Sequence, residues 1–233
     1  PVYLSGEGTQ KTMIVQARLQ NNQEPVITET EDIKGRAGFG YFEYASDTSF
    51  ANAQRTDWLA ASAKNDFWFK TRLINLEPGQ TYFYRLVAGP TQQAAKPLSI
   101  AQFQTLPDTN STAPFQFVAS SCINFARFYG YIGIQGWEDT TVLTQEQKEQ
   151  GFPGLAAIAN ETDAAFWVSN GDNVYYDQPK EPDGIVADSL DEMRAKWHRQ
   201  LSMQNFRLLA NRKQTYWLKD DHDHRYNDSD TTG

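Results

Sequence analysis

Short segments of alternating apolar and polar residues occupy the N-terminal part of the chain, and clusters of Asn, Gly and Pro lie between them. Alternation of this kind, with many β-branched and aromatic residues, is typical of half-buried β-strands, and the clusters are typical of turns. Several short strands separated in this way favour an antiparallel β-sandwich. The segments are residues 13–19, 40–44, 66–73 and 81–87.

The most specific of these signals lies in residues 73–86 (LINLEPGQTYFYRL). The order of a Leu, a Pro-Gly turn and a Tyr resembles the tyrosine corner of fibronectin type III and immunoglobulin-like domains, in which the phenol hydrogen-bonds to upstream backbone. We therefore expect Tyr82 to form such a corner, and an ordinary hairpin with a Pro-Gly turn is the alternative. The predicted sandwich domain covers residues 1–107.

The pattern changes after residues 105–114 (TLPDTNSTAP), a segment rich in Pro, Ser and Thr that suits a linker. Three apolar, strand-like runs follow, at residues 115–119, 164–168 and 216–218, with helical segments between them. Strands that alternate with helices indicate βαβ units and a mostly parallel sheet. A second domain of α/β class is therefore predicted for residues 108–233.

Two helical regions connect these strands. Residues 153–160 (PGLAAIAN) form the first, and Ser189 with Glu192 gives the S-x-x-E capping box that begins the second. We expect His198, beside Trp197, to be a hydrogen-bonded structural residue of that helix rather than a catalytic one. The inward-facing positions, with a shift of phase along the way, are predicted to be Met193, Trp197, Leu201, Phe206 and Leu209.

Composition excludes several classes of protein. Of the 233 residues, 39% are hydrophobic and 13% aromatic, so the chain has enough apolar surface to fold. The net charge of −8 disfavours a nucleic-acid partner, which needs a basic surface. A single cysteine excludes an intrachain disulfide, and no run approaches the roughly 18 apolar residues of a membrane span. The chain begins without a signal pattern, as a mature protein does after its signal is removed.

Polar residues with metal-binding capacity follow each strand of the predicted parallel sheet. Ser-Ser-Cys122 follows the first, Ser-Asn-Gly-Asp172-Asn-Val-Tyr175 the second, and Lys-Asp-Asp221-His222-Asp-His the third. Ligands of parallel α/β sheets bind beyond the carboxyl ends of the strands, so these residues are expected to converge. Gly171 would allow the sharp turn that directs Asp172 to this edge.

The residue types indicate a two-metal site. The thiolate of Cys122 and the phenolate of Tyr175 suit Fe(III), and the two oxygens of Asp172 can bridge two ions. Asp221 and Asn227 offer the hard oxygens that Ca²⁺, Mg²⁺ or Mn²⁺ prefer. Such a pair of ions can generate a hydroxide nucleophile and stabilise the leaving oxygen of a phosphoester.

Other residues near these motifs have alternative interpretations. His222 is placed to protonate the leaving group as a general acid. Cys122 alone would more often be a small buried apolar residue, and Asp220 and Asp223 fit a solvated acidic run. Tyr176 is interpreted as structural. Aromatic residues after Cys122 either line a substrate entrance or pack a loop; these are Phe125, Phe128, Tyr129, Tyr131 and Trp137.

The segments SSC, GDNVYY and DDHDHRYND together resemble alkaline phosphatase D (PhoD), a branch of the calcineurin-like metallophosphatases. The resemblance implies an immunoglobulin-like sandwich followed by an αββα phosphatase domain, and a secreted or periplasmic enzyme that hydrolyses small phosphomonoesters and phosphodiesters. It also implies an Fe(III) and Ca²⁺ centre. In that centre His222 is the proton donor, and the ligands are Cys122, Asp172, Tyr175, Asp221 and Asn227.

The chain departs from this family in one respect. The wider superfamily supplies further Asp and His ligands from the second half of the sheet, whereas this sequence ends soon after the D-D-H-D segment. We therefore expect residues 108–233 to be the first half of the phosphatase domain, inactive alone, with the rest of that domain as partner in the same or another chain. A non-catalytic binding module and a phospholipase D-type member of the same fold are the alternatives.

Overall fold

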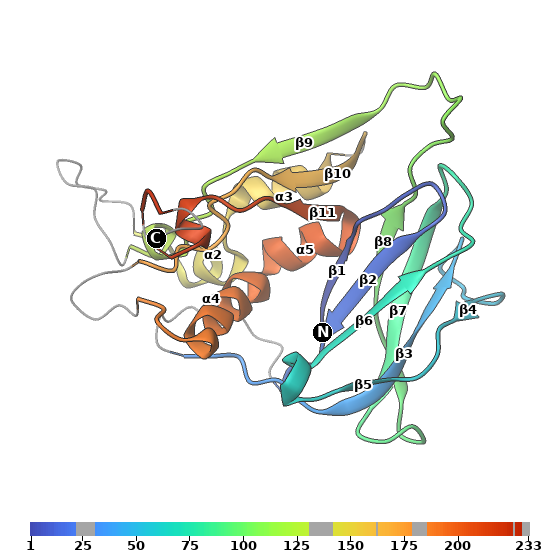
Figure 1. The fold of residues 1–233 in the computed structure, drawn as a ribbon, viewed down its shortest axis with the longest axis horizontal. Helices are drawn as coiled ribbons and strands as arrows, with labels where there is room; N and C mark the ends of the chain where they lie inside the picture. The colour runs from blue at the N-terminus through green and yellow to red at the C-terminus, as the bar shows by residue number, and fades with distance from the viewer. Residues whose placement is uncertain (22–30, 131–141, 162, 179–185, 226, 230–233) are drawn as a thin grey trace.

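The structure is a computed structural model that describes residues 1–21, 31–130, 142–161, 163–178, 186–225 and 227–229. Its N-terminal part is built from strands that pair in an antiparallel manner (Figure 1). A short 3-10 helix, η1 (Ala63–Asn65), precedes the sixth of them. The strands are β1 (Val2–Gly6), β2 (Met13–Arg18), β3 (Gly38–Ala45), β4 (Gln54–Arg55), β5 (Leu59–Ala61), β6 (Trp68–Leu73), β7 (Thr81–Gly89) and β8 (Lys96–Gln104).

These strands form two sheets with a shared apolar core. One sheet has the order β1-β2-β6, the other has the order β4-β3-β7-β8, and β5 pairs with β3. Because side chains alternate across a strand, each sheet directs one set of residues inward. The buried cluster between the sheets includes Tyr3, Phe42, Phe69, Tyr84 and Phe103. The predicted antiparallel sandwich is confirmed, and β1 and β8 are strands that the sequence pattern did not reveal.

Tyr82 forms the predicted corner. Its hydroxyl accepts a hydrogen bond of 3.0 Å from the backbone N–H of Glu77, five residues upstream. Its ring is buried and stacks on Phe103 at a centroid distance of 5.6 Å. The turn between Glu77 and Tyr82 includes Gly79 with a φ of 66°, a conformation that glycine adopts without steric cost. The corner therefore fixes the chain where it enters β7.

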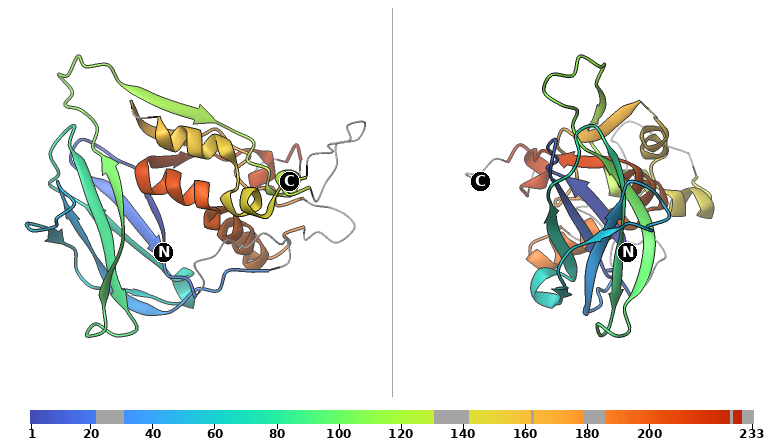
Figure 2. Two further views of the ribbon diagram at one scale, coloured as in Figure 1. Left: turned by 180° about the vertical axis from the view of Figure 1, so that it is seen from behind. Right: turned by 90° about the vertical axis from the view of Figure 1, so that its right-hand side faces the viewer.

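The C-terminal part contains a parallel three-stranded sheet in the order β11-β10-β9. Helices cover one face of it, as the view from behind in Figure 2 shows. A second apolar cluster lies in this part of the chain, and Trp167 of β10 is fully buried in it. The Trp167 ring lies at centroid distances of 6.1 Å from Phe206 and 5.0 Å from Trp217. The elements are β9 (Gln116–Ser120), α1 (Phe125–Phe128), α2 (Gln145–Gln150), α3 (Pro153–Asn160), β10 (Ala164–Ser169), α4 (Leu190–Ser202), α5 (Gln204–Arg212), β11 (Gln214–Trp217) and the 3-10 helix η2 (Asp221–Asp223).

Helices α3 and α4 begin where the sequence predicts, whereas α1 and α2 were not predicted. Ser189 and Glu192 form the capping box of α4, and the expected shift of phase corresponds to a break at Met203 between α4 and α5. Leu201, Phe206 and Leu209 are buried, and Trp197 packs against the same cluster. Met193 is only half-buried and lies outside that cluster. It belongs to the first half of α4, and the first buried position of this helix is Lys196, which bonds to the loop that follows β10.

Phe125, Phe128 and Tyr129 pack on one another and, through Phe128, on Phe152 at 4.6 Å. This contact favours loop packing for them; Tyr131 and Trp137 lie outside the described residues. The two parts of the chain also contact each other directly, because α5 packs against β1 and β8, and β1 against β11. Among the described residues, no helix combines the length and apolar character needed to cross a membrane.

Replacing Tyr82 by Phe should destabilise the sandwich by about 1 kcal/mol, because the backbone N–H of Glu77 loses its part-buried hydrogen bond to the hydroxyl. Equilibrium denaturation with urea measures this change. Tyr41→Phe is the matched control, since the Tyr41 hydroxyl has no hydrogen-bond partner among the residues described here, and its stability should match that of the parent protein within error. Equal stability of both variants would contradict the corner's contribution.

Candidate metal centre

The three segments that follow β9, β10 and β11 converge at one edge of the sheet. Backbone hydrogen bonds join the first two: the N–H of Cys122 donates to Gly171 O at 3.3 Å, and the N–H of Ile123 to Asp172 O at 2.9 Å. The third segment leaves β11 through Leu218, whose N–H donates to Ser169 O of β10 at 2.9 Å. Parallel strands thus deliver their following loops to a common place, as the sequence predicts.

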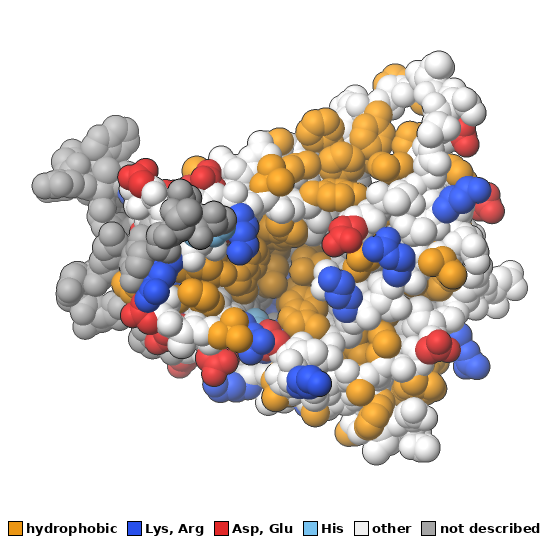
Figure 3. Space-filling view, in the orientation of Figure 1, with side chains coloured by type: hydrophobic (Ala, Val, Ile, Leu, Met, Phe, Trp, Pro, Cys, Tyr) orange, Lys and Arg blue, Asp and Glu red, His pale blue; other side chains and the backbone are white. Residues whose placement is uncertain are grey.

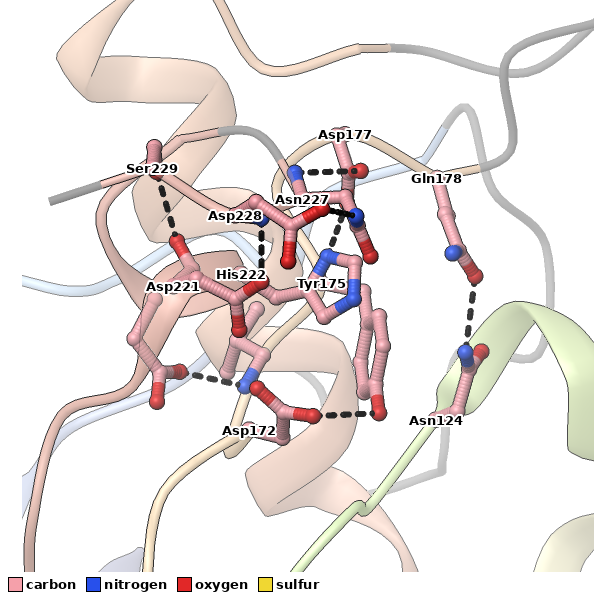
Figure 4. Close-up of polar contacts among 12 residues, drawn as sticks. Asn124, Asp172, Tyr175, Asp177, Gln178, Asp221, His222, Asn227, Asp228 and Ser229 are labelled. Atoms are coloured by element: carbon pink, nitrogen blue, oxygen red, sulfur yellow. Dashed lines mark hydrogen bonds and ion pairs between the residues drawn. The ribbon is translucent and has the colours of Figure 1, made fainter. Parts of the chain in front are cut away.

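Side chains from all three segments meet at Asp172. Figure 4 shows the Tyr175 hydroxyl directed at this carboxylate, with Asp221 and His222 beside it. The Tyr175 hydroxyl donates to Asp172 Oδ2 at 2.9 Å, and Cys122 Sγ lies 3.5 Å from the same oxygen. Asp172, Asp221 and His222 each offer a ligand atom, and these three atoms lie within 4.8 Å of one another. The structure therefore brings together five of the six predicted site residues. Cys122 is exposed, so its interpretation as a buried apolar residue is wrong.

The backbone around Asp172 adopts an unusual conformation. Gly171, Asp172 and Cys122 have φ values of 96°, 53° and 62°, all in the left-handed region. For the two non-glycine residues this conformation is costly and is maintained only when surrounding contacts enforce it. Gly171 has a second constraint, because a Cβ at this position would lie 2.5 Å from Cβ of Asp220. Only glycine fits there.

One oxygen of Asp172 has no protein partner. Oδ1 is buried and lacks a hydrogen bond among the described residues, while Oδ2 receives Tyr175 and Cys122. Burial raises the pKa of Asp172, and the neighbouring Asp221 carboxylate adds to this rise. Burial and the adjacent Asp172 carboxylate likewise raise the pKa of Tyr175. A buried, unpaired carboxylate oxygen among further anionic donors is the arrangement that a cation stabilises, so these residues fit a metal ion.

Asp223 holds the loop that carries Asp172. Its carboxylate accepts the N–H groups of Asn173 and Val174 at 2.9 and 2.8 Å, and the side-chain amide of Asn173 at 2.8 Å. It is 3% exposed. The expectation of a solvated acidic run is therefore wrong for Asp223, because η2 turns this side chain inward toward backbone donors that need an acceptor. Asp220 is exposed as expected.

Helix α4 supports the same loop from the other side. Lys196 Nζ donates to Gln178 O at 2.6 Å, Trp197 Nε1 donates to the Tyr176 hydroxyl at 2.8 Å, and the Gln200 amide donates to Asn173 O. Tyr176 is thus structural, as predicted. Together α4 and Asp223 fix the loop from Asp172 to Gln178 on both flanks.

Sequence reasoning missed Asp177. This residue is fully buried, and its Oδ1 lies 2.8 Å from Nδ1 of His222. An ionised carboxylate accepts, so Nδ1 carries the proton in this pair and Nε2 is the nitrogen on the opposite side of the ring. The His222 ring also lies against the Tyr175 ring at a centroid distance of 4.2 Å. The sequence offered one signal for this pair. Asp177 lies two positions beyond Tyr175, and His222 follows the neighbouring strand, so the two side chains could have been expected to lie close together.

Asn227 lies farther along the same turn. Its side-chain amide donates to Asp228 Oδ2 at 2.5 Å, and its backbone N–H donates to Asp177 Oδ2 at 3.3 Å. Asp221 in turn accepts the N–H of Asp228 at 2.5 Å, which lowers the pKa of Asp221. The Asn227 side chain is therefore engaged beside the cluster, and a ligand role for it remains a prediction.

Comparison with known proteins agrees with this architecture. Residues 3–107 match the family model described as "PhoD-like phosphatase, N-terminal domain". The match covers nearly all of the sandwich, which is therefore similar to the N-terminal domain of PhoD-like phosphatases. A search of curated proteins gave no match.

Two of the solved structures that resemble this chain do so over 95% of its length. A structure of PhoD has a TM-score of 0.69 at 18% identity, and purple acid phosphatase PPD1 from yellow lupin (Lupinus luteus) seeds has a TM-score of 0.54 at 10% identity. Both confirm the predicted fold of a β-sandwich followed by part of an α/β metallophosphatase domain. The present chain spans 38% and 35% of the lengths of these two chains.

Gly171→Ala should destabilise the protein by more than about 1 kcal/mol, because the left-handed φ and the clash with Asp220 both oppose a Cβ. A Cβ at Gly154 in α3 would meet no atom within 4 Å, so Gly154→Ala should stabilise the protein by up to about 1 kcal/mol. Thermal unfolding measured by circular dichroism gives both signs. A neutral Gly171→Ala variant would refute the steric requirement at the site.

Proposed function

We propose that this chain is the N-terminal part of a secreted or periplasmic PhoD-type enzyme that hydrolyses phosphomonoesters or phosphodiesters with the help of two metal ions. One observation carries the proposal. A carboxylate with a buried, unpaired oxygen lies against a thiol, a phenol, a second carboxylate and an imidazole, at the carboxyl edge of a parallel sheet. The fold of the chain is similar to that of PhoD and to that of a purple acid phosphatase, and this similarity supports the same chemistry.

The donor types assign the ligands. Cys122 and Tyr175 would bind Fe(III), because a thiolate and a phenolate are strongly electron-donating anions. Asp172 would hold both ions, because its carboxylate has two oxygens and one of them lacks a hydrogen bond among the described residues. Asp221 would hold Ca²⁺ or another hard divalent ion, with Asn227 as a further oxygen donor. Bound ions supply Lewis-acid chemistry, which lowers the pKa of water and neutralises the charge of a phosphoester.

The chain's own contribution to proton transfer is His222. With Nδ1 committed to the buried Asp177, Nε2 is the nitrogen that can deliver a proton to the leaving oxygen. Asp177 keeps the ring oriented and stabilises the charged imidazolium before the transfer. The stacking of His222 on Tyr175 holds the same ring near the proposed iron ligand.

An apolar face of the sheet indicates the partner. Phe117 and Leu218 are 56% and 57% exposed, and Phe117 stacks on Phe166, which contacts Tyr216 in the next strand. Figure 3 shows hydrophobic side chains gathered over β9, β10 and β11. A face of this kind is normally covered in a soluble protein. We infer that the remainder of the phosphatase domain, in the same or another chain, covers it, and that the 233-residue chain alone is inactive.

Asp172→Asn in the intact protein should abolish phosphatase activity and metal loading together, because a neutral amide cannot bridge two cations. Elemental analysis of iron and calcium, with hydrolysis of p-nitrophenyl phosphate, measures both. Asp163→Asn is the control, since Asp163 is exposed before β10 and should leave both properties unchanged. Full metal content in Asp172→Asn would remove the bridging role.

His222→Ala should keep the metals but lower kcat by about 10²–10⁴-fold for substrates with poor leaving groups, which need a general acid. Substrates with good leaving groups should lose much less. Asp177→Asn should shift the same ratio in the same direction, since it disturbs the orientation of the ring. His224→Ala, two residues away, is the matched control. A uniform loss for all leaving groups would exclude the general-acid role.

A further inference from the structure

Helix α4 carries a histidine that connects it to the sandwich. Nδ1 of His198 lies 2.7 Å from Asp32 Oδ1, and Nε2 lies 2.7 Å from Asp66 Oδ2. The histidine is 4% exposed. Ionised carboxylates only accept hydrogen bonds, so both ring nitrogens must donate, and the ring is an imidazolium. The residue predicted to be a satisfied helix histidine thus joins the two parts of the chain.

The pKa values of the two carboxylates agree with this charge state. Burial alone would raise the pKa of Asp32 and Asp66, yet the hydrogen bond from His198 and its positive charge lower both below their usual value. Lys34 lies 3.7 Å from Asp32, and Arg18 lies 3.1 Å from Asp66. The carboxylates therefore face positive charge from β2, from the segment before β3 and from α4.

Neighbouring cations extend the connection to the backbone. Arg18, which is 2% exposed, donates to Ile33 O at 2.9 Å and to Asp66 O at 3.1 Å. Arg199, the residue after His198, donates to Glu31 O at 2.7 Å. Partly buried, charge-assisted hydrogen bonds of this kind hold the two groups in a narrow range of positions. If one partner moved away, the other would be left as an unpaired charge, which costs free energy. The sandwich thus holds α4 at two successive residues.

The same stretch of α4 holds the loop of the candidate metal centre. Lys196, Trp197 and Gln200 bond to Gln178, Tyr176 and Asn173, and these contacts flank His198 in the sequence. Because α4 is a continuous helix over Leu190–Ser202, a displacement at His198 moves its neighbours with it. One turn of helix therefore connects the sandwich to the loop that carries Asp172.

We propose that His198 is a positioning residue. Through its hydrogen bonds to Asp32 and Asp66, the sandwich domain holds α4 in place, and α4 in turn fixes the loop of residues 172–178 at the candidate metal centre. The N-terminal domain then acts as a support for the catalytic site rather than only as an appended module. The importance of this coupling for catalysis depends on the proposed function, whereas the coupling itself is a mechanical property of the chain. It predicts that a change in the sandwich alters the loop without touching it.

Hydrogen exchange of the intact protein, followed by mass spectrometry, tests the coupling. Asp32→Asn changes a residue of the sandwich and replaces one of the two carboxylates that contact His198 by a neutral amide. It should speed amide exchange in peptides covering residues 172–178 by about tenfold, with little change in the sandwich core. His198→Ala should give the same pattern. Gln102→Ala is the matched control, because Gln102 also joins the two parts, by a 3.4 Å hydrogen bond to Arg212 O of α5, but does not contact α4.

Two outcomes would overturn the proposal. Faster exchange in α4 with unchanged exchange in residues 172–178 would show that the loop does not depend on the hydrogen bonds between the sandwich and His198. An equal rise throughout the protein, or the same rise in Gln102→Ala, would show only general destabilisation. If His198→Ala fails to fold, Asp32→Asn decides the question. Exchange requires neither metal nor turnover, so a protein without phosphatase activity would overturn the proposed function and leave this measurement decisive.

Discussion

The burial of the Asp172 carboxylate is the constraint on which the site depends. Its Oδ2 receives a phenol and a thiol, its Oδ1 is buried without a hydrogen-bond partner in the described part of the chain, and its backbone is left-handed. Each of these features costs free energy in a folded protein. They persist together because the surrounding segments leave the loop no alternative position. A carboxylate kept in this state is ready to bind a cation without rearrangement.

The supports of that loop come from opposite directions. Asp223 binds its backbone N–H groups from η2, and α4 binds its carbonyl groups through Gln200 and Lys196. Donors and acceptors of one loop are thus satisfied by two different elements, each anchored elsewhere. The β11 sheet fixes η2, and the sandwich fixes α4 through His198. The strain at Asp172 is consequently opposed by both parts of the chain.

Much of this could be predicted from the sequence, and the gaps have physical reasons. Tyr82 was predictable because a tyrosine corner has a fixed local order, and Asp172 because strand ends in a parallel sheet converge. β8 (Lys96–Gln104) was missed because half of its positions are exposed and its Lys-Pro start is atypical of a strand. Asp177 and Asp223 were missed because an acidic residue has the same sequence signal whether it faces water or a buried donor. Only the turn geometry decides which.

The donor set also explains how a cation and protons compete at this site. Burial raises the pKa of Asp172 and of Tyr175, and a neighbouring carboxylate adds to each rise, so both groups hold a proton more tightly than they would in water. A metal ion reverses this balance, because it stabilises the anionic forms that it binds. Metal binding at this cluster must therefore release protons, and acid must weaken it. His222 contributes differently, because its Nδ1 is already paired with the buried Asp177 carboxylate, which leaves Nε2 on the opposite side of the ring. The pairing that orients this ring thus separates its proposed role as a proton donor from the ligand roles proposed for Asp172 and Tyr175.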